Sequence, residues 1–299
     1  MAKYFNENTI LFYDGQMMKA TEAHTNLYGQ TLHYGYGVFE GIRSYGTENG
    51  PRIFKAREHY ERLLNSCQLM GIPFEYTVEE MTDISYKVLE QNGFNDAYLR
   101  PLVLCDPSMT LINGQQGRLV IAAWEWGAYL GEKLLNLKIS TYCRPHPRSV
   151  HMEAKAVGHY VNSILATSEA RKGGFDEALL LDCEGFLAEG PGANLFFEKD
   201  GTLFTPALGH ILPGITRTTV LEMCAELGIP VEQGRFTPED LFEADGAFFC
   251  GTGAEIVGIQ TVDHQSFKKE WGSSVGNKLR QKYLQLVREQ TTQPESIEA

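Results

Sequence analysis

Five stretches of the sequence combine residue types that could carry out chemistry. Lys155 stands among small residues just before an apolar run, and a lysine in a desolvated site becomes a nucleophile toward carbonyls. Glu189 is followed directly by a glycine-rich turn. Residues 212–217 and 250–255 both place backbone N–H groups beside hydroxyls, which is the usual construction of an anion-binding site. Most single lysines and turn glutamates are solvated, so each signal alone is weak.

The remaining stretch, residues 33–43, holds three glycines, three aromatic residues and an arginine. Its glycine spacing only approximates a dinucleotide-binding fingerprint, so a glycine-bulged strand is the ordinary interpretation. Taken together, a candidate nucleophilic lysine, a candidate buried acid and two anion-binding sites indicate a phosphorylated cofactor that binds lysine covalently. Pyridoxal phosphate fits, because its aldehyde needs a lysine, its ring nitrogen an acid and its phosphate a set of N–H groups.

The elements that must position these residues begin with an α+β first half. Strands are expected at 10–13 and 16–18 around an Asp-Gly turn, and again at 98–105 and 119–124. Helices are expected over 55–70 and from a capping box at 77–80 up to Gly93. The periodicity breaks at residues 124–133. We interpret this segment as an interdomain loop between a small domain at 1–123 and a large cofactor-binding domain at 134–299.

The second half alternates short strands with helices. Apolar runs predict strands at 177–182, 194–197, 202–204 and 247–250. Caps and helical periodicity predict helices at 162–171, at 218–227, behind Thr237 and at 275–290.

Composition excludes several classes of partner. The chain has 299 residues and a formal net charge of −12, which disfavours nucleic acid and anionic membranes and leaves a small molecule as the expected partner. The N-terminus lacks the apolar run of a signal peptide, and no run of about 18 apolar residues occurs, so we expect a cytoplasmic protein. None of the six cysteines forms a Cys-x-x-Cys pair, so we expect scattered, buried thiols and no metal site.

Seven ordered stretches between about Tyr13 and about Arg288 resemble the branched-chain aminotransferases of the fold-type IV pyridoxal-phosphate enzymes. The resemblance implies an α+β fold, with a small N-terminal α+β domain and a larger C-terminal domain in which helices surround a mixed, barrel-like sheet. It also implies pyridoxal-phosphate-dependent transfer of the amino group from L-leucine, L-isoleucine or L-valine to 2-oxoglutarate, in a homodimer or larger assembly. The motifs are residues 33–43, 97–102, 126–131, 154–156, 189–196 and the two anion-binding stretches.

The resemblance also assigns residues to the site. Lys155 would be the Schiff-base lysine, Glu189 the partner of the pyridine nitrogen and Tyr160 a hydrogen-bond donor to the ring oxygen. Arg62 would bind the phosphate together with Ile215, Thr216 and Thr252. The implied substrate-binding residues are Tyr34, Phe39, Arg43, Tyr98, Arg100, Trp126, Tyr129, Thr252 and Gly253, with Arg100 near the distal carboxylate of glutamate and a loop carrying Met109 and Leu111 reaching the neighbouring subunit.

Alternatives remain at this stage. D-amino-acid transaminases, (R)-selective amine transaminases and aminodeoxychorismate lyases share the lysine, the acid and the anion-binding stretches, but differ on the substrate side. A glycine-rich nucleotide-binding protein without catalysis is the alternative from another class. His159, Ala193 and Gly253 depart from residues common in the family, and these departures affect substrate ranking rather than the catalytic groups.

Overall fold

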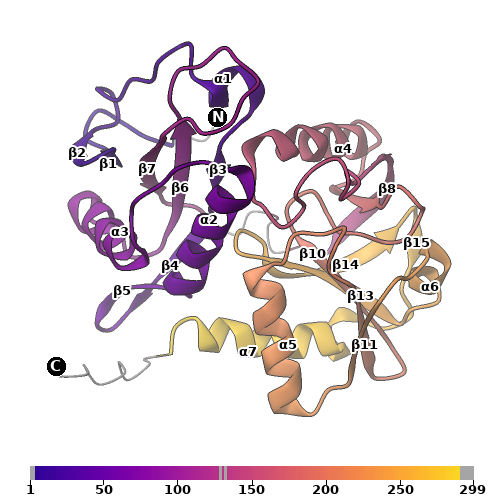
Figure 1. The fold of residues 1–299 in the computed structure, drawn as a ribbon. Helices are drawn as coiled ribbons and strands as arrows, with labels where there is room; N and C mark the ends of the chain where they lie inside the picture. Colours follow the sequence, from indigo (N-terminus) through magenta and orange to yellow (C-terminus); the bar gives the residue numbers. More distant parts are fainter. Residues whose placement is uncertain (1–3, 128–129, 131–132, 290–299) are drawn as a thin grey trace.

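The computed structural model describes residues 4–127, 130 and 133–289, which form two sheets with their own helices (Figure 1). Within these residues the first sheet has seven strands in the order β2-β1-β7-β6-β4-β5, with β3 on β6, and every pairing is antiparallel. Its strands are β1 (Ile10–Tyr13), β2 (Gln16–Lys19), β3 (Val38–Phe39), β4 (Ile42–Thr47), β5 (Gly50–Ile53), β6 (Ala97–Cys105) and β7 (Gly117–Trp124).

The helices of this half are α1 (Gln30–Tyr34), α2 (Ala56–Met70) and α3 (Val78–Asn92). The predicted capping box at Thr77 is present, and Gly93 ends α3 in the left-handed conformation, as expected. Leu63 on α2 and Met81 and Val88 on α3 are fully buried against the sheet. The two helices therefore cover the face of the sheet with their apolar sides.

The second sheet is mixed and has eight strands among the described residues, in the order β12-β11-β10-β13-β14-β8-β9, with β15 on β14. The β11–β12, β14–β8 and β8–β9 pairings are parallel and the others antiparallel. The strands are β8 (Leu135–Cys143), β9 (Glu177–Leu181), β10 (Asn194–Lys199), β11 (Thr202–Pro206), β12 (Val231–Gly234), β13 (Gly246–Gly251), β14 (Glu255–Val262) and β15 (Gln265–Ser266).

Helices α4 (Tyr160–Lys172), α5 (Ile215–Leu227), α6 (Pro238–Phe242) and α7 (Val275–Leu286) accompany this sheet (Figure 1). The predicted capping box at Thr237 is formed. The expected α+β class, with a mixed second sheet, is confirmed. The proposed interdomain loop at 124–133 falls partly on residues outside those described, so the boundary between 1–123 and 134–299 stays a prediction.

Two features join the halves. A hydrophobic core cluster shared by the two halves packs Tyr45 and Phe54 of the first half against Phe196, Phe248 and Tyr283 of the second. The segment that begins at Gly35 also runs beside the segment that carries Lys155, and backbone hydrogen bonds join the two. The Phe39 N–H donates to the Lys155 carbonyl (3.0 Å). In the other direction, the Val157 N–H donates to the Gly37 carbonyl (2.9 Å) and the Gly158 N–H to the Gly35 carbonyl (2.9 Å).

The predicted glycine-bulged strand at 33–43 is only partly correct. His33 and Tyr34 end helix α1, Gly35 stops it with a φ of 66°, and strands β3 and β4 follow. A Cβ on Gly35 would lie 2.7 Å from the Gly158 Cα, so this position needs glycine for close approach as well as for its backbone angle. The glycines thus allow two backbones to meet beside Lys155.

The prediction that all six cysteines are buried is wrong for two of them. Cys67, Cys105, Cys224 and Cys250 are buried, whereas Cys143 and Cys183 are exposed. Cys143 is the last residue of β8 and Cys183 lies two residues after β9, and strand periodicity does not predict exposure at such positions.

Candidate active site

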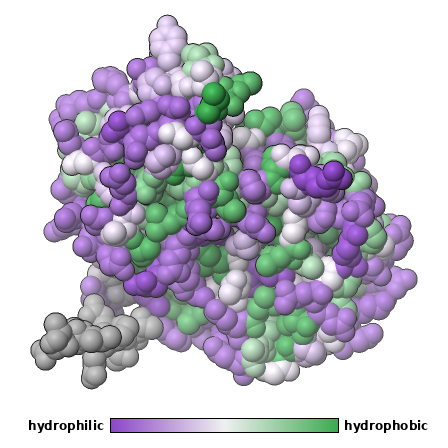
Figure 2. Space-filling view, in the orientation of Figure 1, coloured by the Kyte–Doolittle hydropathy of each residue, from purple (hydrophilic) through white to green (hydrophobic). Residues whose placement is uncertain are grey.

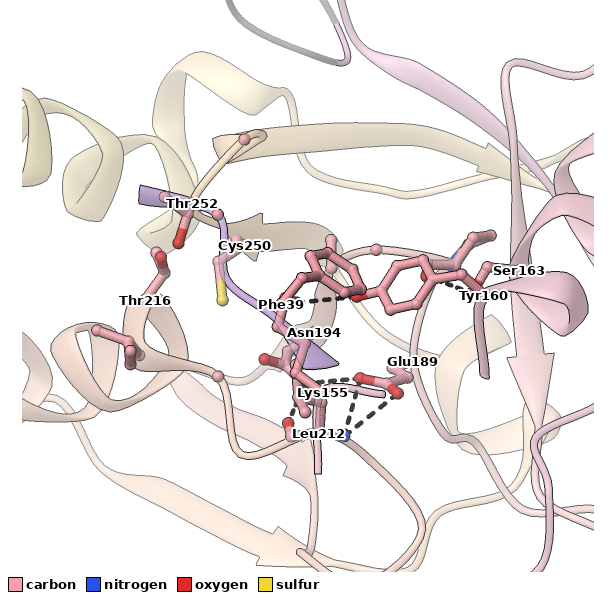
Figure 3. A pocket seen from close by; sticks show the side chains of 18 of the residues that line it. Phe39, Lys155, Tyr160, Ser163, Glu189, Asn194, Leu212, Thr216, Cys250 and Thr252 are labelled. Carbon is pink, nitrogen blue, oxygen red and sulfur yellow. Dashed lines mark hydrogen bonds between the residues drawn. The ribbon is translucent and has the colours of Figure 1, made fainter. Parts of the chain in front are cut away.

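A cavity of about 390 Å³ lies between the two halves, a volume typical of sites for small ligands. It is lined from the first half by residues on β3, α2 and β6, and from the second by the Lys155 segment, α4 and the loops around β10, α5 and β13 (Figure 3). The cavity brings together twelve residues singled out from the sequence: Phe39, Arg62, Tyr98, Arg100, Trp126, Lys155, Tyr160, Glu189, Ile215, Thr216, Thr252 and Gly253.

Lys155 is held in place by its backbone and reaches the cavity with its amine. Its N–H donates to Ser66 Oγ at 3.0 Å, and the flanking Ala154 and Ala156 are almost completely buried. The Nζ donates to Tyr160 Oη at 2.8 Å and lies 5.2 Å from the centre of the Phe39 ring. The small neighbours noted in the sequence therefore allow close packing, while the side chain itself faces the cavity (Figure 3).

Glu189 is a buried carboxylate at the floor of the cavity, only 2% exposed. It accepts hydrogen bonds from Asn194 Nδ2 (3.0 Å) and from the Leu212 N–H (3.2 Å), and its Oε1 lies 2.9 Å from an Arg144 guanidinium nitrogen. Burial raises the pKa of Glu189 above its ordinary value, and the charge of Arg144, the Leu212 hydrogen bond and the charge of Lys155 oppose that rise. A cationic ligand atom beside Glu189 would therefore favour its ionised form.

Sequence reasoning missed Arg144. Its guanidinium contacts Glu189 and also donates to Ser163 Oγ (3.1 Å) and to the Gly190 and Pro191 carbonyls (3.2 and 3.3 Å). Arg144 follows a strand and precedes a proline, and nothing in that local pattern signals a contact with a residue 45 positions later. It holds both the carboxylate and the glycine-rich turn behind it.

The opposite end of the cavity can bind an anion. Helix α5 begins after Gly214, which supplies no side-chain cap, so the first N–H groups of the helix face the cavity near Thr216 and Thr252 (Figure 3). A Cβ on Gly214 would lie 1.9 Å from Asn194 Oδ1, so only glycine fits there. The backbone, the helix dipole and two hydroxyls together suit a phosphate.

Arg62 reaches this end from helix α2 through a buried ion pair. Its Nε and one NH₂ donate to the two carboxylate oxygens of Glu40 at 2.7 and 2.9 Å, and its other NH₂ donates to the Pro213 carbonyl at 2.9 Å. His59 Nδ1 lies 2.7 Å from the same carboxylate. Glu40 and His59 hold the Arg62 guanidinium beside the start of α5, and neither was among the site residues predicted from the sequence. The sequence did offer one signal for Glu40, because it is an acidic residue inside the glycine-rich motif at 33–43.

These contacts change the protonation of the cluster. Burial alone would raise the pKa of Glu40, but the charge of Arg62 and the hydrogen bond with His59 outweigh it, so the pKa of Glu40 lies well below its usual range. Burial lowers the pKa of His59, and the nearby Glu40 only partly offsets this. The cluster therefore holds an ionised carboxylate against Arg62, with a neutral imidazole that donates from Nδ1.

Replacing Glu40 with glutamine should lower the free energy of unfolding by about 3 kcal/mol, because Arg62 would keep a buried charge without its partner. Chemical denaturation at pH 7 measures this. The matched control is Glu61→Gln on α2, the helix that carries Arg62, and the exposed pair of Glu61 with Arg57 (3.5 Å) should contribute less than about 1 kcal/mol. Equal losses in the two variants would contradict the role given to Glu40.

The stabilisation that Glu40 contributes depends on pH, and the sign of that dependence follows from the lowered pKa of Glu40. The stabilisation is complete above the ordinary pKa of an unfolded glutamate, about 4.3, and is lost as the pH falls toward the lower folded value. The difference between wild type and Glu40→Gln should therefore be constant between pH 7 and 5 and smaller at pH 4. A difference that grew on acidification would contradict the assignment.

Aromatic residues and one arginine form one side of the cavity. The Arg100 guanidinium lies 4.7 Å from the centre of the Phe39 ring and donates to Tyr98 Oη at 3.1 Å. The Tyr98 and Trp126 rings meet edge to face at 4.8 Å. A Cβ on Gly41 would lie 2.0 Å from Tyr98 Oη, so glycine at position 41 makes room for this hydroxyl. The wall can contact an aliphatic chain and can also attract a carboxylate.

Two sequence-predicted residues, Tyr34 and Arg43, do not line the cavity of this chain. Tyr34 is 43% exposed and donates to the Met109 carbonyl at 3.2 Å. Arg43 pairs with Glu255 at 3.1 Å and donates to the Trp126 carbonyl at 2.8 Å, so it holds the segment behind the cavity. Tyr129 lies outside the described residues.

Two further properties concern the described residues as a whole. Among residues 4–127, 130 and 133–289, no three His, Cys, Asp or Glu side chains are grouped so that they could hold a metal ion. Within the same part of the chain, no helix combines the length and apolar character needed to cross a membrane.

Comparison with known proteins matches the chain over most of its length. The profile of the amino-transferase class IV family matches residues 37–262, and the chain belongs to this family. The branched-chain-amino-acid aminotransferase of Pseudomonas aeruginosa is 39% identical over 284 residues, which cover 93% of this chain and 92% of the relative.

Solved structures also match the chain over most of its length. The branched-chain aminotransferase of Thermoproteus uzoniensis with norvaline superposes with a TM-score of 0.90 at 37% identity, covering 93% of this chain and 94% of that one. The T.th. branched-chain amino acid aminotransferase complexed with N-(5'-phosphopyridoxyl)-L-glutamate gives a TM-score of 0.88 at 36% identity, covering 94% of both chains.

Proposed function

We propose that this chain is a pyridoxal-phosphate-dependent transaminase that transfers the amino group of L-leucine, L-isoleucine or L-valine to 2-oxoglutarate, giving branched-chain 2-oxo acids and L-glutamate. The observation that carries the proposal is the convergence of the Lys155 amine, the buried Glu189 and the uncapped start of α5 on one cavity. The phosphopyridoxyl-glutamate named for the T.th. relative supports both the cofactor and the second substrate.

The residues present fit pyridoxal phosphate at three separate places. The start of α5, Thr216, Thr252 and the cluster around Arg62 suit its phosphate, Glu189 suits its ring nitrogen, and Lys155 suits its aldehyde. When bound, the cofactor supplies an aldehyde that carries the amino group and a ring that takes up the electron pair released at the substrate Cα.

The protein side of the reaction rests on Lys155 and its neighbours. The amine, once released by the incoming amino acid, removes the Cα proton and later delivers a proton to the cofactor carbon. Tyr160 Oη, 2.8 Å from Nζ, orients the amine and would hydrogen-bond the ring oxygen of the bound cofactor. Glu189 stays ionised beside the ring nitrogen, with Arg144 and Asn194 holding its two oxygens. A protonated ring nitrogen is stabilised by that charge.

The substrate would lie between the Thr252–Gly253 backbone and the aromatic wall. The backbone N–H groups and the Tyr98 hydroxyl receive the α-carboxylate, and Phe39 and Trp126 contact a branched aliphatic side chain. Arg100 offers its guanidinium to the distal carboxylate of glutamate. One cavity thus accepts both an apolar and an anionic amino acid.

An exposed apolar surface supports a homodimer or larger assembly. Helix α1 holds the loop at 107–114 through Gln30, whose amide donates to the Thr110 and Ile112 carbonyls at 2.8 and 3.0 Å. At the top of Figure 2, where α1 lies, a few hydrophobic side chains are exposed among hydrophilic ones, and exposed apolar side chains that lie together are typical of contact surfaces. The exposed residues there are Leu27, Tyr28, Leu32, Tyr34, Met109, Leu111 and Ile112.

A paired-substrate panel tests the proposed activity. Purified holoenzyme should convert L-leucine, L-isoleucine and L-valine with 2-oxoglutarate and show a near-ultraviolet or visible cofactor band that borohydride reduction removes. D-alanine under the same conditions should give no 2-oxo acid above background. Turnover of D-alanine in preference to L-leucine would favour the D-amino-acid transaminases of the same fold, and a protein without the cofactor band would overturn the proposal.

A further inference from the structure

Cys143 and Cys183 lie side by side outside the cavity. Cys143 is the last residue of β8, and Cys183 follows β9 by two residues. Their Sγ atoms are 3.1 Å apart, and both residues are exposed, unlike the four buried cysteines. The proposed amino transfer uses neither of them. Two exposed thiols in contact, 40 positions apart in the chain, are a specific arrangement that the fold itself creates.

The backbone holds both thiols in this position. Cys143 is in register with Leu181 in the parallel β8–β9 pair, and the Arg144 N–H donates to the Leu181 carbonyl at 2.8 Å. On the other side, Asp182 Oδ1 accepts from the Glu184 and Phe186 N–H groups at 2.8 and 3.0 Å and fixes the turn that carries Cys183. Neither thiol therefore depends on a mobile segment to reach the other.

We propose that Cys143 and Cys183 are a redox modification site, which forms a reversible intrachain disulfide when a peroxide is the oxidant. One thiolate attacks the peroxide, its O–O bond breaks, and a sulfenic acid and hydroxide result. The second sulfur attacks the sulfenic sulfur and expels its oxygen, which leaves as water after taking up a proton. Two thiols lose two electrons and two protons, and one hydrogen peroxide becomes two waters. The sulfurs must close from 3.1 Å to about 2.05 Å, which side-chain rotation can supply.

The contacts of Cys183 indicate which of the two thiols attacks the peroxide first. The Cys183 thiol donates to the Arg144 carbonyl at 3.2 Å and so keeps its proton. Its hydrogen bond with Cys143 raises the pKa of Cys183 to about 11, and partial burial and the nearby charges of Asp182 and Glu184 act in the same direction. Cys143 is therefore the first nucleophile and Cys183 the resolving thiol.

The disulfide would close a loop of the chain that contains Lys155, Tyr160 and all of α4. Cross-linking the ends of that loop restricts the unfolded chain and stabilises the folded form. Oxidised holoenzyme should therefore melt several degrees above reduced holoenzyme, and dithiothreitol should reverse the shift. This consequence does not depend on the identity of the amino-acid substrate.

Peptide mapping tests the proposal directly. Holoenzyme is treated with hydrogen peroxide, its free thiols are blocked under denaturing conditions, and it is digested with trypsin. Cleavage sites in the sequence place Cys143 in the peptide 139–148, since Arg144 precedes proline, and Cys183 in the peptide 173–199. These two peptides should appear joined, two hydrogens lighter than their sum, and should separate after dithiothreitol.

Cys143→Ser and Cys183→Ser are matched variants at exposed positions. Each should remove the joined peptides and the rise in melting temperature. After peroxide treatment, Cys183→Ser should carry a sulfenic acid on Cys143, whereas Cys143→Ser should leave Cys183 unoxidised. Three results would overturn the proposal: peroxide oxidation that stops at sulfinic acid on Cys143, cross-links between two copies in place of the intrachain bond, or the same shift in melting temperature in both serine variants.

Discussion

Lys155→Ala should lower kcat for L-leucine and 2-oxoglutarate by on the order of 10³, because the substitution removes both the covalent anchor of the cofactor and the group that carries the Cα proton. The absorbance band of the lysine-bound cofactor should disappear as well. Steady-state kinetics and an absorption spectrum of the purified variant measure the two effects together.

The variant should still fold, since the Lys155 backbone makes its own contacts. Two backbone hydrogen bonds of residue 155 remain when its side chain is shortened: its N–H donates to Ser66 Oγ, and its carbonyl accepts from the Phe39 N–H. Lys172→Ala, an exposed lysine of helix α4, is the control and should keep wild-type kcat and absorbance. Wild-type turnover by Lys155→Ala with an unchanged melting temperature would show that another group performs the transfer.

Elements with local signals could be predicted from the sequence. The helix behind Thr77 and the one behind Thr237 both begin at capping boxes, whose partners are three residues apart. Strand β13 is a short apolar run that is buried along its length, as the pattern indicated. In each case the determining contacts lie within the element or next to it, so spacing alone is sufficient.

Elements defined by distant partners were missed. Strand β14 begins at Glu255 in the left-handed conformation, contains Gly258 and pairs in parallel with β8, more than a hundred positions earlier. Strand β8 does alternate, with Leu135 and Leu137 buried, so a usable signal was present there. Helix α1 is only five residues long, and a glycine-rich segment follows it, which hid the change from helix to strand.

The same distinction separates the site residues. Lys155 and Glu189 stand in unusual local surroundings and were found, and the structure brings both to the cavity. Arg144 and Glu40 act on Glu189 and Arg62 through contacts that only the folded chain creates. The exposure of Cys143 and Cys183 also depends on where two strands end side by side. Cavity-lining residues were therefore predictable where residue type and neighbours marked them, whereas their buried ionic partners were not.

Glu189→Gln should lower kcat by about 10², the effect of removing one prearranged electrostatic contact, while KM and cofactor binding change little. Glutamine can still accept from the Leu212 N–H, but it cannot carry the negative charge that a protonated ring nitrogen needs. Glu177→Gln is the control, since Glu177 is equally buried on β9, bonds to Thr167 and lies outside the cavity lining. Equal kcat in the two variants would remove Glu189 from the mechanism.

The pH profile separates this electrostatic role from a merely structural one. Burial raises the pKa of Glu189, a protonated ring nitrogen beside it would oppose that rise, and the carboxylate takes up a proton as the pH falls through the resulting value. Because only the ionised form supports the ring nitrogen, kcat of the wild type should fall as the pH is lowered through that value. Glu189→Gln has no proton to gain at this position and should lose that acidic limb, whereas Glu177→Gln should keep it. A variant that kept the wild-type limb would show that the acid dependence arises from another group.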